Sequence, residues 1–184
     1  MPFDYYRRLS PRAQRIYDAS DRVTELPLPG AERLHPFVAG LREALAAEDR
    51  RAVEGAADHL ARGITELLGV PPVRVEVLAV RPHADWGELH GTYEPAEGPR
   101  PPRVRLWMRT AHHRRVVAFR SFLRTLLHEV GHHLDYAYLK LADSLHTEGF
   151  FRRESNLFRQ LAPVEAASSR RGPDGPATST RSDR

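Results

Sequence analysis

The sequence contains no cysteine, and its only lysine is Lys140. Without cysteine the chain has no disulfide framework, no thiolate zinc knuckle and no cysteine nucleophile, so a metal site must be built from histidine, aspartate and glutamate. Uninterrupted apolar runs of roughly 18 to 20 residues are also missing, which excludes a membrane span. The N-terminus lacks the apolar stretch of a secretory signal, so we expect a cytoplasmic protein.

Acidic and basic residues nearly balance along the 184 residues. The 28 lysines and arginines exceed the 24 aspartates and glutamates, giving a net charge of +4, and ten histidines provide further nitrogen ligands. The guanidinium group suits phosphate recognition, which makes nucleic acid an alternative partner, but this charge excess is modest for the chain length. The hydrophobic content of 41% is typical of a globular protein with one domain.

Apolar residues recur at helical spacing through the first seventy residues. Ser10 and Pro11 provide an N-cap and a first helical residue. Two further amphipathic patterns predict helices over 34–45 and 53–68, and the stretch 69–72, with one glycine and two prolines, ends this part. Their apolar stripes indicate helices that complete the core rather than cover a functional cleft.

The apolar period changes to two in the middle of the chain. Residues 73–77 alternate between apolar and charged side chains and run into the apolar residues 78–80, which predicts a first strand. Residues 104–108 form a second clear pattern, and residues 86–93 form a weaker one. A loop over 95–102, rich in proline and glycine, separates the last two. We therefore expect a small sheet of three short, mostly antiparallel strands.

The helical period returns over 115–139, where one apolar stripe runs along the predicted helix. After a break at 142–144, a last helix continues to Leu161. Residues 163–184 contain no aromatic side chain and are predicted to be a disordered tail. The sequence thus predicts a single α+β domain over 1–162, with N-terminal helices, a three-stranded sheet and two final helices.

The most informative motif is His128-Glu129-Val130-Gly131-His132, inside the first of these two final helices. Histidines four residues apart project from one helix face and can bind one metal ion, while the glutamate lies beside its open position. This HExxH pattern is typical of zinc peptidases, in which the metal activates a water molecule and the glutamate takes its proton. We therefore expect His128 and His132 as metal ligands and Glu129 as the general base.

A catalytic zinc ion usually has a third protein ligand, which must lie outside this motif. The metzincin pattern would need a glycine and then a histidine or aspartate where Asp135 and Tyr138 stand, so it is excluded. The downstream candidates are His146, Glu154 and Glu148, in that order of preference. Glu154 falls on the apolar stripe of the last helix, where it would be a gluzincin-type ligand, a hydrogen-bond acceptor for a ligand histidine, or an arginine partner.

Other polar residues near the motif have weaker assignments. Asp135 can orient an imidazole, although a position on the helix surface is favoured. His133 is expected to be structural or exposed. Tyr136 and Tyr138 are candidates for stabilising an oxyanion, with packing against the sheet as the favoured role.

The residues around the motif resemble a known family. Residues 125–132 (TLLHEVGH), followed by residues 146–150 (HTEGF), resemble the core of the SprT-like (Spartan-type) metalloproteases. The resemblance covers residues 103–161. The sequence departs from the family pattern at Thr147, where the family has glycine.

This resemblance implies a zincin-like fold with Zn2+ bound by His128, His132 and His146 and with Glu129 as the general base. It also implies that residues 105–108 form the edge strand over the active-site cleft. We therefore expect a zinc-dependent metallopeptidase that acts on a protein or peptide substrate. The alternative is a basic, metal-stabilised module that binds nucleic acid or a protein partner, in which Glu129 has no catalytic task.

Overall fold

The computed structural model describes residues 2–84 and 87–162, and within this part the α+β class is confirmed. The predicted tail, 163–184, lies outside the described residues. The elements are, in chain order, η1 (Asp4–Arg8), α1 (Pro11–Arg22), η2 (Ala31–Leu34), α2 (His35–Ala46), α3 (Arg50–Leu67), β1 (Arg74–Val80), β2 (His83–Ala84), β3 (Gly87–Glu88), β4 (Gly91–Glu94), β5 (Arg103–Arg109), α4 (Phe119–Ala137) and α5 (Glu148–Leu161).

The three-stranded sheet has the order β1-β5-β4 and is mixed. β4 pairs antiparallel with β5, as expected, whereas β1 pairs parallel with β5 through partners such as Val75 and Val104. The expectation of a mostly antiparallel sheet therefore needs correction. Alternating apolar residues fix the buried face of a strand, but they do not fix which strand becomes its neighbour.

The position of β5 corrects a second expectation. Residues 105–108 lie in the central strand, and β4 is the strand at the edge of the sheet that packs beside α4. β5 is suited to the centre because Val104, Leu106 and Met108, which share one face, are each at most 1% exposed. The weaker pattern over 86–93 divides between β3, which pairs with β2, and β4.

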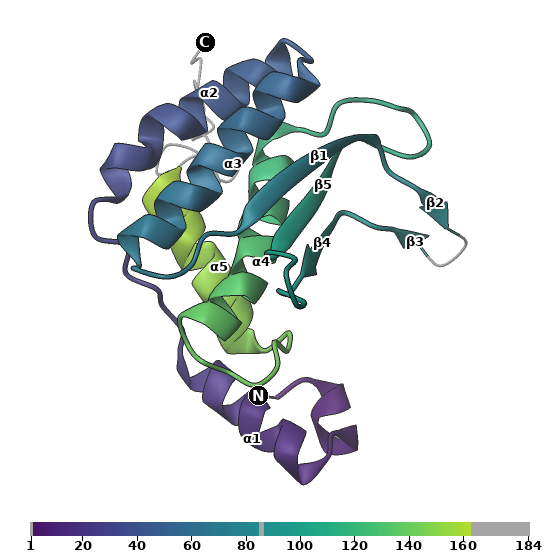
Figure 1. Ribbon diagram of the computed structural model, residues 1–184. Helices are drawn as coiled ribbons and strands as arrows, with labels where there is room; N and C mark the ends of the chain where they lie inside the picture. The colour runs from purple at the N-terminus through teal and green to yellow at the C-terminus, as the bar shows by residue number, and fades with distance from the viewer. Residues whose placement is uncertain (1, 85–86, 163–184) are drawn as a thin grey trace, which may run out of the picture.

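In residues 2–84 and 87–162, the helices that contact the sheet pack on one face of it. α3 packs on β1, and α4 packs on β4 and β5 (Figure 1). On the opposite face, Arg103 and Arg105 form ion pairs with Glu76 and Glu94 at N–O distances of 2.6–3.3 Å. At the start of β5 the sheet therefore alternates between buried apolar residues and paired charged residues, whereas Trp107, on the charged face, is also buried.

The helix that carries HExxH begins later than the predicted residue 115. Val116 forms a β-bridge with Arg109, and the Val117 amide donates to the Met108 carbonyl at 2.9 Å, so these residues still extend the sheet. α4 starts only at Phe119. In the described part of the chain, none of the helices is both long and apolar enough to cross a membrane.

The N-terminal helix α1 lies at one end of the molecule, away from the sheet, and packs on α5 (Figure 1). Ser10 caps it by accepting a hydrogen bond from the Ala13 amide, as expected. Its last turn meets the start of α5, where the Gly149 amide donates to the Asp21 carboxylate at 2.8 Å. A Cβ on Gly149 would lie 2.5 Å from the Asp21 carbonyl oxygen, so the two backbones are in direct contact.

Replacing Gly149 with alanine is expected to lower the free energy of unfolding by about 1–3 kcal/mol, because the new Cβ meets backbone atoms that have to move. Gly55→Ala in α3 is the matched control. Nothing lies within 4 Å of a Cβ at Gly55, so the better helix propensity of alanine should raise stability by up to about 1 kcal/mol. Urea unfolding followed by circular dichroism measures both, and equal stabilities would contradict the close approach of α1 and α5.

Candidate metal centre

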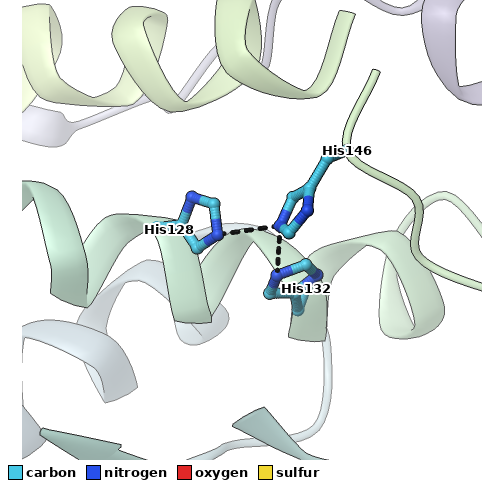
Figure 2. A group of neighbouring side chains, drawn as sticks. All are labelled: His128, His132 and His146. Carbon is cyan, nitrogen blue, oxygen red and sulfur yellow. Dashed lines mark hydrogen bonds between the residues drawn. The ribbon is translucent and has the colours of Figure 1, made fainter. Parts of the chain in front are cut away.

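Three histidine side chains converge at the C-terminal half of α4. His128 and His132 project from the same face of this helix, one turn apart, and His146 reaches them from the loop between α4 and α5 (Figure 2). The His146 Nε2 atom lies 3.0 Å from Nε2 of His128 and 3.2 Å from Nε2 of His132. The structure therefore brings together the three ligand candidates that the sequence favoured.

Glu154 fixes the protonation of His128. The Nδ1 atom of His128 lies 3.1 Å from a Glu154 carboxylate oxygen, which can only accept, so Nδ1 carries the proton. Nε2 is then left with its lone pair directed at the centre of the cluster. Arg124 donates to the other Glu154 oxygen at 3.2 Å and holds this carboxylate in place.

Ser144 and Asp135 determine which ring nitrogen of His132 carries the proton. The Ser144 hydroxyl donates its single proton to Asp135 at 2.7 Å, so at 2.8 Å from His132 Nδ1 it must accept a hydrogen bond. His132 therefore also carries its proton on Nδ1 and presents a free lone pair on Nε2. Asp135 is fully buried and bonded to Arg153 at 2.8 Å, so the expectation of a surface position is wrong.

This donor set fits a metal ion. A proton on His146 Nε2 would satisfy at most one of the two lone pairs that face it, whereas a cation satisfies all three nitrogens at once. Ligands about 2.0–2.1 Å from a tetrahedral zinc ion lie roughly 3.3 Å apart, close to the observed spacings. Burial, together with the neighbouring His128 and His146, lowers the pKa of His132 to about 3, and burial also lowers the pKa of His146. Both therefore stay neutral, which is the form that binds metals.

Aromatic rings pack against the three imidazoles. The ring of Phe150, which is 2% exposed, has its centroid 4.8–5.4 Å from those of His128, His132 and His146. Phe151 stacks on His146 with an interplanar angle of 20°. These contacts restrict the rings of the ligands, so the nitrogens are held in place before a metal binds.

Glu129 lies beside the histidines and faces the edge strand. It lines a cavity of about 400 Å3 together with His128, Glu154, Thr125 and Gly91 of β4. A Cβ on Gly91 would lie 2.7 Å from a Glu129 carboxylate oxygen, so only glycine lets β4 approach so closely. Burial raises the pKa of Glu129 to about 7, although His128 opposes this shift. A carboxyl with such a pKa both takes and returns a proton near neutral pH.

The other candidates occupy supporting positions. Glu148 pairs with Arg152 on the same helix, outside the histidine cluster, and Glu154 acts as an acceptor for His128. His133 is buried and structural: its Nε2 donates to the Pro71 carbonyl, and its Nδ1 accepts from the Tyr93 hydroxyl. Neither glutamate belongs to the ligand cluster that the described residues form.

Of the two predicted tyrosines, Tyr136 donates to Asp143, and Tyr138 is exposed at the end of α4. A tyrosine outside this pair, Tyr93 of β4, stacks its ring on that of His132 with centroids 6.5 Å apart. Burial raises the pKa of Tyr93 to about 12, so it remains a hydrogen-bond donor. The sequence could have pointed to Tyr93 through its spacing, because a residue two positions from Gly91 lies on the same face of the strand.

Comparison with known proteins gives no match to this chain among family models, curated proteins or solved structures. A function is therefore inferred from the chemistry of the site rather than from kinship.

The metal ligands can be distinguished from the supporting glutamate by substitution. After loading with zinc, the wild-type protein is expected to hold about one ion per chain, and His128→Ala, His132→Ala or His146→Ala should remove it, because two nitrogen ligands bind weakly. Glu154→Gln should keep the ion, since the amide oxygen still accepts from His128, with an affinity lowered by about tenfold or less. Elemental analysis after dialysis measures the content.

His59→Ala serves as the control, because His59 stacks on Phe37 far along the chain from the cluster. It should bind zinc as the wild type does. Zinc retained in His146→Ala but lost in Glu154→Gln would show that the glutamate, rather than His146, is the third ligand.

Proposed function

We propose that this protein is a zinc-dependent metallopeptidase that hydrolyses peptide bonds in a protein or peptide substrate. The observation that carries this proposal is the convergence of three imidazole nitrogens beside Glu129. His128 and Glu129 also line a cavity bounded by the edge strand β4. The resemblance of the HExxH motif and of residues 146–150 to SprT-like metalloproteases supports the same assignment.

His128, His132 and His146 would hold the zinc ion. When bound, zinc supplies a Lewis acid that polarises a water molecule and the carbonyl of the peptide bond. Glu129 accepts a proton from the attacking water and delivers it to the nitrogen of the departing amine. Glu129 is placed for this double task because it lines the same cavity as His128, next to the edge strand β4.

The edge strand offers a way to bind the substrate. β4 pairs on one side with β5, and its Gly91 lines the cavity that also contains His128 and Glu129. An extended peptide that adds to the other side of β4 would run past this cavity. The close packing of Gly91 on Glu129 brings such a peptide within reach of the base.

The charged cluster on the solvent face of β5, within the described residues, does not favour the alternative of a nucleic-acid-binding module. The arginines at the solvent face of β5 are paired with Glu76 and Glu94, and these four side chains carry no net charge. A phosphate backbone is bound by an excess of positive charge, which this cluster does not provide.

Replacing Glu129 with glutamine tests the catalytic role. The zinc-loaded variant is expected to bind the metal as the wild type does, because all three ligands remain, and to cleave an unfolded, fluorescently labelled protein about 10²- to 10⁴-fold more slowly. Zinc content and the release of labelled peptides are measured on the same samples. Glu66→Gln, on the exposed side of α3, is the matched control and should cleave normally.

Two results would count against this assignment. Cleavage that persists at the wild-type rate in Glu129→Gln removes the proposed role of this residue. Zinc binding without cleavage of any unfolded protein by the wild type would favour a structural role for the metal.

A further inference from the structure

The N-terminal segment contacts the candidate metal centre at two separate points. This segment, residues 2–23, comprises η1 and α1 and is called the N-terminal clamp below. We infer that the clamp positions the ligands His132 and His146, so that docking of the clamp and binding of the metal stabilise each other. The inference rests on the proposed metal site and adds a means by which the site can be regulated.

The first contact fixes the backbone of His146. The Tyr5 hydroxyl in η1 donates to the His146 carbonyl at 2.5 Å. Phe3 packs edge-on against Phe151, with ring centroids 6.1 Å apart, and Phe151 in turn stacks on the His146 imidazole. The loop that carries the third ligand is therefore held by the clamp on its main chain and supported through an aromatic pair on its side chain.

The second contact reaches His132 through a chain of hydrogen bonds. Arg153 of α5, 2% exposed, donates to the carbonyls of Ser20 and Val23 at 2.6 and 2.5 Å. The same guanidinium donates to Asp135 at 2.8 Å, and the other oxygen of Asp135 accepts from Ser144. Since Ser144 accepts from His132 Nδ1, the end of α1 and a metal ligand belong to one network.

The interface between the clamp and the loop that carries His146 is buried where Ser20 meets Thr147. Ser20 and Thr147 are both fully buried, and their hydroxyl oxygens lie 3.3 Å apart. Thr147, next to His146 in the chain, also caps α5 by accepting from the Phe150 amide. Movement of the end of α1 would therefore disturb the residue that follows the third ligand.

These contacts predict a reciprocal effect. If the clamp detached, Arg153 would lose three acceptors, the carbonyls of Ser20 and Val23 and the Ser20 hydroxyl, and the His146 loop would lose its donor, so the metal would have to order the loop itself. Partners that orient metal ligands typically contribute ten- to a hundredfold to affinity. Because coupling between two binding events is mutual, metal binding must protect the clamp by the same factor.

A purely structural role for these residues predicts a different pattern. The hydrogen bonds would then stabilise the protein equally with and without metal, and the metal affinity would not depend on them. Removing one hydroxyl at a partly exposed end of the network distinguishes positioning of the ligands from a purely structural role. Such a substitution leaves the buried pair of Arg153 and Asp135 intact, so the fold is kept.

The first experiment measures zinc affinity by competition with a chromophoric chelator. Tyr5→Phe, which removes the donor to His146, and Ser144→Ala, which removes the acceptor for His132, should each weaken binding about ten- to a hundredfold. Tyr138→Phe, at the exposed C-cap of α4, and Ser121→Ala, at an exposed position within α4, are the matched controls. Both should bind zinc as the wild type does. Circular dichroism of the metal-free variants checks that they remain folded.

The second experiment measures amide hydrogen exchange in the wild-type protein with zinc and with a chelator. Zinc is expected to slow exchange in α1 by about tenfold or more, while the amides of α2 and α3, which pack in the main core, serve as internal references. This measurement needs no variant, so it decides the question even if a substitution prevents folding. The difference in α1 should shrink in Tyr5→Phe and Ser144→Ala.

The outcomes distinguish the two proposals. A wild-type protein that binds no zinc overturns both the metallopeptidase and the metal-linked clamp. Zinc binding with unchanged affinity in both variants, together with exchange in α1 that does not respond to zinc, overturns the clamp alone and leaves the proposed function standing.

Discussion

The ion pair between Arg153 and Asp135 joins the fold to the candidate metal centre. Both side chains are almost entirely buried, and charges in such a place are tolerated only when their polar atoms have partners. Arg153 meets this requirement with two carbonyls and a hydroxyl of α1, and Asp135 meets it with Ser144. One set of hydrogen bonds therefore settles the position of α1, the path of the loop before α5 and the orientation of His132.

The two candidate ligands on α4, His128 and His132, have different hydrogen-bond acceptors at Nδ1. His128 donates to the carboxylate of Glu154, which makes its Nε2 a stronger electron donor, whereas His132 donates to the neutral hydroxyl of Ser144. Both carboxylates in these networks are themselves paired with arginines, so the supporting groups add no net charge to the site. In the proposed site, Glu129 would then be the nearby carboxylate that balances the positive charge of a bound ion.

The sequence predicts those parts of the site that depend on local spacing. The period of 3.6 residues places His128, Glu129 and His132 on α4, and the apolar stripe of α5 correctly indicates that Glu154 faces inward. The burial of Asp135 and the role of Ser144 depend on residues far away in the chain, such as Arg153, and no local pattern records them. The expectation that residues 105–108 form an edge strand was wrong for the same reason, since alternation along β5 is compatible with either position in the sheet.

The placement of β5 has a consequence for how the chain folds. β5 is the last of the three strands to appear in the sequence, yet it lies between the other two and supplies the pairing partner for both. During synthesis β1 and β4 therefore have no strand to pair with until residues 103–109 have been made. The helix of the candidate metal centre follows only ten residues later, so the sheet and α4 form late and nearly together, after α2 and α3 have had time to pack on each other.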